Sequence, residues 1–245
     1  VMENSPESVS SYMKISPETI SIFKHCASIN PGIIVDPGNV IYSMSESRTI
    51  RLQATVQENF PVQFALVNVN QFLNTLSLVN SPELEFQDDH VDISSADGKQ
   101  KFQYWFSDPA IIQQYNKPLK FDVTYDIEFN ISREDLSQLN RAASVIGAED
   151  ICVYSHENDS EIYVSAIDKQ QNMGKGNNFA LKIGENTGLS DKSFKIYFRK
   201  SNLKLTGNDF TVKVTKGLST WYANNANVPE LLFHIAIERD SEINV

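Results

Sequence analysis

The feature that constrains this chain most is an internal repeat at a constant offset of 116 residues. The segment 15–29 aligns without a gap with the segment 131–145. In both segments apolar residues recur at helical spacing. We therefore expect two similar modules, neither of which is long enough to enclose much core alone. The matched pairs are Ser16 with Ser132, Glu18 with Glu134, Ile20 with Leu136, Phe23 with Leu139, Ala27 with Ala143, and Ser28 with Ser144.

Both copies carry the chemistry of a helix start. Ser16 and Ser132 are expected N-caps, because a serine hydroxyl can accept a hydrogen bond from the free amides of a first turn. Pro17 stands at the first helical position, where a missing N–H costs nothing. Asp135 lies three residues after Ser132 and resembles the end of a capping box. A helix is therefore predicted after each serine.

The remainder of each module is predicted to be rich in β-strands. Alternating and β-branched runs indicate strands, and turn residues separate them. The predicted fold class is therefore α+β, with two tandem similar domains, each with two short helices packed on antiparallel sheets. The corresponding segments are strands at 33–35 and 151–154, strands at 49–54 and 161–166, short helices at 69–76 and 198–205, and hairpin sets at 84–106 and 210–238.

The domain limits follow from the same pattern. Residues 1–12 are Ser-rich without apolar periodicity, which predicts a disordered N-terminal extension or a cloning remnant. Residues 13–107 form the first predicted domain and 127–245 the second. Between them, 108–126 contains two prolines and few helix signals, and it is predicted to be a connector.

The composition is that of a globular chain, with 41% of its 245 residues hydrophobic. No apolar run reaches membrane-spanning length and no basic-then-apolar leader is present, so we expect neither a membrane span nor a signal peptide. Cys26 and Cys152 lie far apart in the sequence. We interpret both as small buried apolar groups rather than disulfide partners or metal ligands, which fits a reducing cytoplasm.

The formal net charge of −10 argues against a nucleic-acid partner, because DNA-binding proteins usually carry excess Lys and Arg. The charge is unevenly distributed, however. Residues 194–216 contain six basic residues and one acid, Asp209, whereas acids collect at 83–92 and in the tail 238–242. Such a surface can repel DNA on one side and hold it on another. An acidic protein with a locally basic hairpin is the alternative.

Polar stripes recur on the predicted helices, opposite their apolar faces. The residues in the first helix are Ser21, Lys24, His25 and Ser28, and the matching ones in the second half are Ser137, Asn140, Arg141 and Ser144. Short polar residues with a few long basic ones suit loose contact with phosphates, without base reading. A solvated helix face is the ordinary explanation of one such stripe. Its recurrence in both halves favours DNA.

No catalytic motif stands out. Gly174-Lys175-Gly176 lacks the spacing of a phosphate-binding loop, and the four histidines are scattered. The acidic run 88–92 is interpreted as a turn between strands rather than a metal site. We therefore expect no enzyme activity, no cofactor and no metal.

Three segments carry a family resemblance: Met13-Lys-Ile-Ser at the start of the first module, residues 27–33, and Asn70 to Val79. From about Met13 to the C-terminus, the chain resembles the DNA polymerase sliding clamps of T4-like bacteriophages. The resemblance implies a closed homotrimer in which six domains form a pseudo-sixfold ring. Twelve helices would line the hole, sheets would form the outside, and duplex DNA would pass through without sequence specificity.

The resemblance also implies partners. These are the viral replicative DNA polymerase, an ATP-driven clamp loader and late transcription factors, in the cytoplasm of an infected bacterial host. The residues expected to face DNA are Lys24, His25, Arg133, Arg141, Arg199, Lys200 and Lys204. Clamp partners in this family insert a short C-terminal peptide into an apolar pocket near the connector. The candidates here are Ile111, Ile112, Tyr115 and Leu119, for which ordinary packing of the connector is the alternative.

Two other classes remain open from the sequence. One is a viral structural or assembly protein built from duplicated β-rich domains. The other is an enzyme whose site forms between the two modules, which would require a convergent cluster of titratable groups. The feature that distinguishes the clamp from both is convergence of the two polar stripes on a shared central hole.

Overall fold

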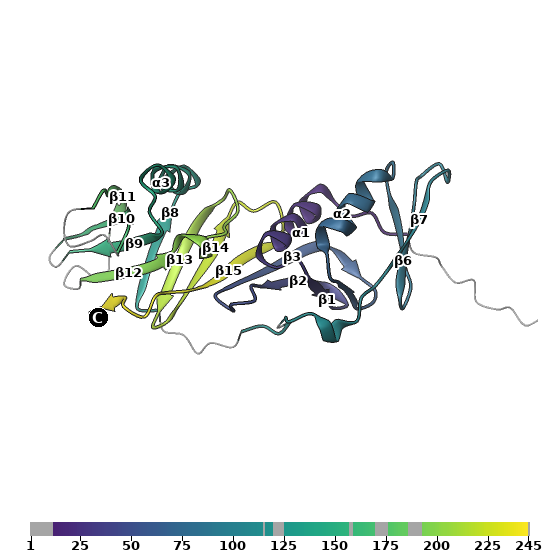
Figure 1. Ribbon diagram of the computed structural model, residues 1–245, viewed down its shortest axis with the longest axis horizontal. Coiled ribbons are helices and arrows are strands. Elements are labelled where there is room, and N and C mark those ends of the chain that lie inside the picture. Colours follow the sequence, from purple (N-terminus) through teal and green to yellow (C-terminus); the bar gives the residue numbers. More distant parts are fainter. Residues whose placement is uncertain are drawn as a thin grey trace, which may run out of the picture. The chain divides into compact units, whose positions relative to one another are not determined.

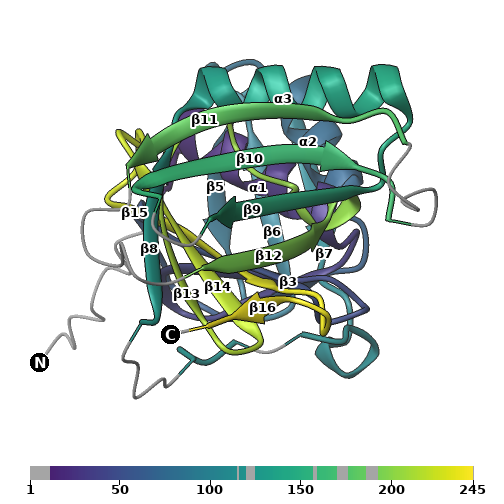
Figure 2. The same cartoon turned by 90° about the vertical axis from the view of Figure 1, so that its left-hand side faces the viewer.

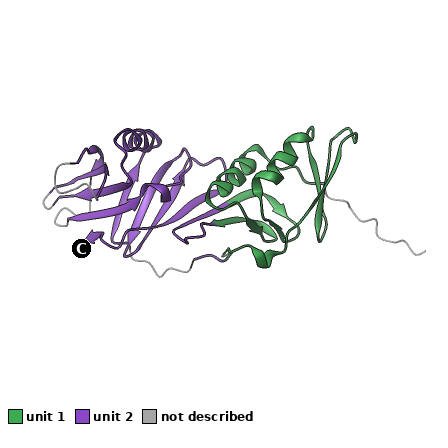
Figure 3. Cartoon of the chain, in the orientation of Figure 1, with its two compact units in different colours: residues 1–43, 55–116 green, residues 44–54, 117–245 purple. Residues whose placement is uncertain are grey.

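The computed structural model describes residues 12–114, 116–119, 125–156, 159–169, 176–185 and 193–244. The chain divides into two compact units (Figure 3): unit 1 comprises residues 1–43 and 55–116, and unit 2 comprises 44–54 and 117–245. The division after Asn116 falls inside the predicted connector, and the segment 44–54 groups with unit 2. Within the predicted N-terminal extension, 1–11 lie outside the described residues.

The first half of the chain contains two α-helices, which lie side by side in unit 1 (Figure 1). Strands β1 and β4 pair antiparallel, and β5, β6 and β7 form a three-stranded antiparallel sheet in that order. The elements are α1 (Pro17–Ile29), β1 (Ile33–Val35), β2 (Gly38–Met44), β3 (Ile50–Phe60), β4 (Phe64–Leu66), α2 (Val69–Leu78), β5 (Glu83–Phe86), β6 (His90–Ser94), β7 (Lys101–Trp105) and a 3-10 turn, η1 (Pro109–Ile111).

The second half forms two antiparallel sheets and one α-helix within its described residues. One sheet has the order β11-β10-β9-β12-β16, and α3 runs along its β11 edge (Figure 2). The other has the order β15-β14-β13-β8, with the start of β3 next to β15. The elements are β8 (Ile127–Ile131), α3 (Arg133–Ile146), β9 (Asp150–Ser155), β10 (Glu161–Ile167), β11 (Phe179–Glu185), β12 (Phe194–Arg199), η2 (Lys200–Asn202), β13 (Asp209–Thr215), β14 (Leu218–Asn224), β15 (Glu230–Ala236) and β16 (Glu242–Ile243).

Both predicted helix starts are confirmed. The Ser16 hydroxyl accepts a hydrogen bond from the Thr19 amide at 3.2 Å, and Pro17 is the first helical residue. The Ser132 hydroxyl accepts from the Asp135 amide at 3.0 Å and donates to the Asp135 carboxylate at 2.7 Å. Asp135 thus completes the cap through its own carboxylate. Each repeat therefore begins its helix by the same local chemistry.

Aromatic side chains fill the core of each unit. In unit 1, Phe60 contacts Phe64 and Phe86 with ring centroids 5.4 and 6.0 Å apart. In unit 2, Trp221 is 1% exposed and meets Phe198 and Phe210 edge-on, with centroids 5.6 and 5.9 Å apart. Edge-to-face contacts of this kind are favourable beyond the area that they bury. Each duplicated module therefore has its own aromatic cluster, and the predicted α+β class with two tandem similar domains is confirmed.

Two details of the predicted repeat are wrong. The second short helix at 198–205 is absent, because β12 runs to Arg199 and only the 3-10 turn η2 follows. In β12 alternate residues Phe194, Ile196 and Phe198 are buried, so pairing with β9 sets a period of two. The segments 49–54 and 161–166 are also not equivalent. Counted from the helices, β3 is the third strand and β10 the second, so β3 corresponds to β11.

Candidate nucleic-acid interface

The polar stripe of α1 lies on the solvent side of that helix. Its apolar residues Ile22, Phe23, Cys26 and Ile29 are buried in unit 1. The stripe residues Ser21, Lys24 and Ser28 are exposed and His25 is half-buried, as the sequence predicts. Among the described residues Lys24 makes no ion pair, so its ammonium group is available to a phosphate.

The matching stripe of α3 is also exposed. Leu136, Leu139 and Ala143 face the core of unit 2. The four stripe residues of this helix and Arg133 are exposed. The Arg133 backbone amide donates to the Asp209 carboxylate at 2.7 Å, which ties the start of α3 to β13. The helix therefore presents two arginines and several short polar side chains to solvent.

The basic segment after β12 adds to the stripe of α3. The Lys200 ammonium donates to the Ser144 hydroxyl at 2.9 Å, so η2 lies against the last turn of this helix. Lys204 is exposed beyond it. Unit 2 thus places Arg141, Lys200 and Lys204 on α3 or in the segment that follows β12. On α2 the exposed residues Asn70, Gln71 and Asn74 carry no charge, as the sequence indicates.

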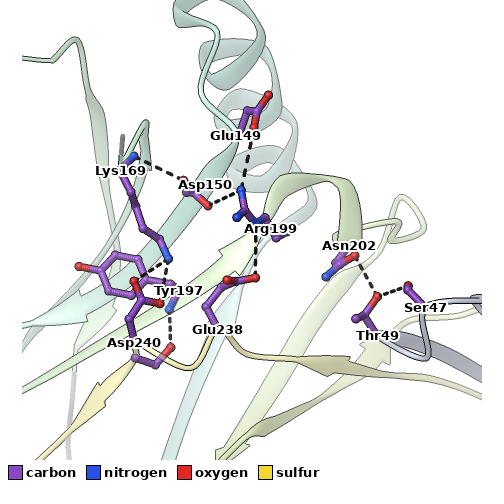
Figure 4. Close-up of polar contacts among 11 residues, drawn as sticks. Ser47, Thr49, Glu149, Asp150, Lys169, Tyr197, Arg199, Asn202, Glu238 and Asp240 are labelled. Atoms are coloured by element: carbon purple, nitrogen blue, oxygen red, sulfur yellow. Dashed lines mark hydrogen bonds and ion pairs between the residues drawn. The ribbon is translucent and has the colours of Figure 1, made fainter. Parts of the chain in front are cut away.

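Arg199 lies in a different environment from the other predicted DNA-facing residues. Its guanidinium group faces three carboxylates: Glu149 at 3.9 Å, Asp150 at 3.6 Å and Glu238 at 3.5 Å (Figure 4). Along β12 its side chain alternates with the buried Phe198, so it lies on the solvent face of the sheet. The charge of Arg199 is therefore engaged by carboxylates that lie far from it in the sequence.

The connector residues predicted to form a partner pocket are spread out. Ile111 is 67% exposed, whereas Ile112 packs over Gly32 and Leu119 is half-buried. Tyr115 lies outside the described residues. The course of the connector is set by Gln114. Its carboxamide donates to the backbone carbonyls of Ile34 at 2.9 Å and Tyr42 at 2.8 Å, and accepts from the Ile34 amide at 3.0 Å.

A pocket of about 630 Å³ lies at the other end of the connector, within unit 2. The isoleucines at the two ends of the acidic tail give it apolar walls. This pocket is absent from the sequence-based prediction, because the tail had been interpreted only through its charge. The sequence signal that could have revealed the pocket is the pair of isoleucines, Ile237 and Ile243, on either side of the acidic residues of the tail. The lining residues are Asp126, Lys216, Gly217, Ile237, Glu238, Arg239, Ser241 and Ile243.

Within the described ranges, the remaining titratable groups do not form a cluster suited to catalysis. Burial raises the pKa of the Cys26 and Cys152 thiols to about 12, which keeps them protonated at neutral pH. Burial, reinforced by the charge of Arg51, lowers the pKa of His234 to about 4. The turn predicted at 88–92 is shorter than expected: the Gln87 amide donates to the His90 carbonyl at 2.9 Å, and the residues from His90 onward form β6.

The described residues contain neither a candidate metal cluster nor a helix suited to crossing a membrane. No group of three or more His, Cys, Asp or Glu side chains is arranged to hold a metal ion there. None of the helices in this part of the chain combines the length and the apolar character that crossing a membrane requires.

Solved structures of known proteins share this fold. The chain matches PCNA from Entamoeba histolytica with a TM-score of 0.63 and 13% identity, covering 90% of this chain and 94% of that one. It matches A. fulgidus PCNA, in a structure with the C-terminal region of FEN-1 bound, with a TM-score of 0.65 and 11% identity; the match covers 92% of this chain and 97% of that one. The fold is that of a sliding clamp.

Sequence relatives narrow the class. The family described as gp45 sliding clamp, C terminal, matches residues 128–228. The sliding clamp of Vibrio phage KVP40 is 28% identical over 204 residues, which cover 82% of this chain and 90% of the relative. Those of Enterobacteria phage T4 and Escherichia phage RB69 are 25% and 28% identical, each covering 94% of this chain and 98% of the relative. Over most of its length the chain is therefore similar to the sliding clamps of T4-like bacteriophages.

This similarity bears on the classes that the sequence left open. Sliding clamps are non-enzymatic processivity factors, so the prediction that the chain is not an enzyme is confirmed. The alternative of a viral structural or assembly protein is not favoured, because the curated relatives are named as sliding clamps.

Proposed function

We propose that three copies of this chain form a closed ring around duplex DNA and tether the viral replicative polymerase to it. The observation that carries the ring is a pairing between strands of the two repeats. In unit 2, β15 lies beside the start of β3: the Ala236 amide donates to the Thr49 carbonyl at 2.9 Å, and the Gln53 carboxamide to Glu230 at 3.3 Å.

The counterparts of these two strands have open edges. By position in the repeat, β15 corresponds to β7 and β3 corresponds to β11. Within the described part of the chain, β7 and β11 are each the last strand of their sheets. An open edge displays unpaired N–H and C=O groups, which natural proteins cover or pair. The edge of β7 also exposes Phe102 and Trp105, which are 42% and 58% exposed.

Pairing β7 of one copy with β11 of the next would repeat the β15–β3 junction between copies. Such an interface is head-to-tail, and it closes into a ring when the rotation per copy divides a full turn. Three copies with two repeats each give the pseudo-sixfold ring of the resemblance. Since the described residues of this chain contain three α-helices, three copies would contribute nine α-helices rather than the expected twelve.

The helix faces would allow the ring to slide. We propose that Lys24, His25, Arg133, Arg141, Lys200 and Lys204 approach the phosphates of the duplex. Attraction between ammonium or guanidinium groups and phosphates is independent of sequence, and short polar neighbours leave room for water. Because the exposed residues of α2 carry no charge, contact would depend most on unit 2. We leave Arg199 out of this set, since three carboxylates already surround it.

The partners follow from the same proposal. The polymerase and an ATP-driven loader would insert C-terminal peptides into the pocket beside the tail, where Ile237 and Ile243 offer apolar contact and Lys216 offers a charge. Late transcription factors would use the ring in the same way. The clamp would act in the cytoplasm of the infected bacterium.

The mass of the assembly in solution tests the ring. Light scattering across a concentration series at moderate salt is expected to approach three times 27.6 kDa and to fall on dilution. A dimer at every concentration would contradict the ring, because two copies give only four repeats. A monomer at every concentration, with crosslinking on primed DNA also giving no trimer, would contradict it as well.

A further inference from the structure

The C-terminal tail of the chain folds back onto β12 after β15 ends. Phe194 and Lys195 pair with Ile243 and Glu242 in the short strand β16. Three further backbone groups of β12 or its approach are used: the Glu238 amide donates to the Tyr197 carbonyl at 2.8 Å, the Tyr197 amide donates to the Ser241 hydroxyl at 3.0 Å, and the Asn244 amide donates to the Ser193 carbonyl at 3.2 Å. The tail thus covers the edge of the five-stranded sheet.

Two ion pairs fasten the tail on either side of Tyr197 (Figure 4). Arg199 meets Glu238 at 3.5 Å, and its other carboxylate partners, Glu149 and Asp150, fix the guanidinium group from the end of α3 and the start of β9. Lys169 meets Asp240 at 2.9 Å, with its ammonium group 4.2 Å from the centre of the Tyr197 ring. Arg199 and Lys169 therefore bind the tail at two nearby positions, Glu238 and Asp240.

The backbone pairing of the tail is short. Its strand is only two residues long, and a strand of that length is marginal alone. Each ion pair is partly exposed to solvent, so each adds a modest amount that salt can screen. The seated position of the tail therefore depends on the two cationic side chains together.

The pocket beside the connector exists only while the tail is seated. Five of its eight lining residues belong to the tail or to its approach, whereas Asp126, Lys216 and Gly217 supply the rest. Neither Arg199 nor Lys169 lines this pocket. We propose that Arg199 and Lys169 are positioning residues for partner binding, which hold the tail as one wall of the pocket. This inference rests on the proposed docking of partner peptides there.

Hydrogen exchange of the intact clamp tests the anchoring without any partner. Lys169→Gln and Arg199→Gln should each speed amide exchange at Glu238 and Asn244 about threefold, and the double variant about tenfold, as expected for two weak ion pairs. In the wild-type clamp, exchange there should rise with salt, and in the double variant it should not. Lys182→Gln is the matched control, because it removes an ion pair with Glu161 on the same sheet without touching the tail.

Peptide binding tests the consequence. A labelled peptide of the last 20 or so residues of the polymerase from the same genome is the probe, since open peptide sites favour flexible termini. Its affinity should fall about tenfold in the double variant and stay unchanged in Lys182→Gln. Arg199→Gln leaves the buried Asp150 without this counter-charge, which could unfold the variant. In that case Arg199→Lys replaces it, because lysine keeps the positive charge but lacks the planar guanidinium group that contacts several carboxylates at once.

The outcomes separate the two proposals. Unchanged tail exchange in a folded double variant overturns the anchoring. Faster exchange with unchanged peptide affinity overturns the positioning role. If the wild-type clamp does not bind the peptide while exchange responds to the variants, the docking in this pocket fails and the anchoring stands.

Discussion

Gln103→Pro in β7 should abolish the ring and leave the subunit folded. Hydrogen bonds from Phe106 to Asp89 and from Ser95 to Gln100 fix the pairing of β7 with β6. In an antiparallel pair, successive residues direct their N–H groups alternately toward and away from the partner strand. Residues 100 and 106 bond to β6, so the even-numbered residues between them face β6 and the N–H of Gln103 faces the open edge. Proline at that position removes a donor that the neighbouring copy would use, and it costs the β7–β6 ladder nothing.

The expected loss is large because every interface of the ring contains the same change. An unpaired carbonyl together with the bulk of the proline ring should cost on the order of 3 kcal/mol per interface, or about 100-fold in affinity. Sedimentation velocity should then show monomers at concentrations where the wild-type chain is trimeric. Gln103→Thr, which keeps the N–H and suits a strand, is the control. A trimer that survives the proline, with thermal unfolding unchanged, would exclude β7 from the interface.

Reversing the charge of Arg141, Lys200 and Lys204 to Glu should prevent the ring from being held on DNA. Three reversals change the charge of a subunit by six, and the trimer carries them three times. Each phosphate contact contributes about 0.9 to the slope of log affinity against log salt, so the slope should fall by roughly two to three units per subunit in contact. Affinity at low salt should fall at least about tenfold.

Matched reversals elsewhere separate local contact from net charge. Lys14, Lys99 and Lys117 are exposed and lie outside α1, α3 and the segment after β12, so their reversal to Glu changes the net charge equally. DNA affinity over a salt series and processive synthesis by the polymerase are the measurements. Equal losses in both triple variants would mean that the helix faces have no special role. The trimer mass and unfolding temperature should be unchanged in each.

Local chemistry predicted the parts of the fold that depend on neighbours in the sequence. Ser16 and Ser132 cap helices because the amides that they accept lie three residues away. The buried and exposed faces of α1 and α3 follow from helical spacing alone. The repeat made these predictions stronger, since two segments with the same pattern indicate one structure.

The errors came from contacts between residues distant in the chain. Residues 198–205 contain helix-compatible spacing, yet Phe198 pairs with Ile151 in a ladder that local sequence does not reveal. The strand equivalence failed because the connections differ in length between the repeats. Only Asp36 and Pro37 separate β1 from β2, whereas five residues separate β9 from β10.

The candidate site shows the same difference between contacts of sequence neighbours and contacts of distant residues. The family resemblance placed Arg199 among the DNA-facing residues, but the local sequence does not reveal that the distant residues Glu149 and Glu238 pair with its guanidinium group. The pocket beside the tail joins residues 126, 216–217 and 237–243, so no single segment encodes it. The predicted contact residues on the helices remain predictions; Lys24, Arg133 and Arg141 are exposed and His25 is half-buried.

Retention on a linear duplex tests the central claim, that the ring encircles DNA, most directly. One end of the duplex is fixed to a bead, the clamp is added at a concentration that favours the trimer, and the free end is then blocked with a bulky protein. A ring threaded from the free end should stay on the blocked duplex through washing at moderate salt. It should leave when a restriction enzyme cuts the duplex between bead and block. Retention that does not depend on the block, or that survives the cut, would show binding by affinity alone and contradict the account.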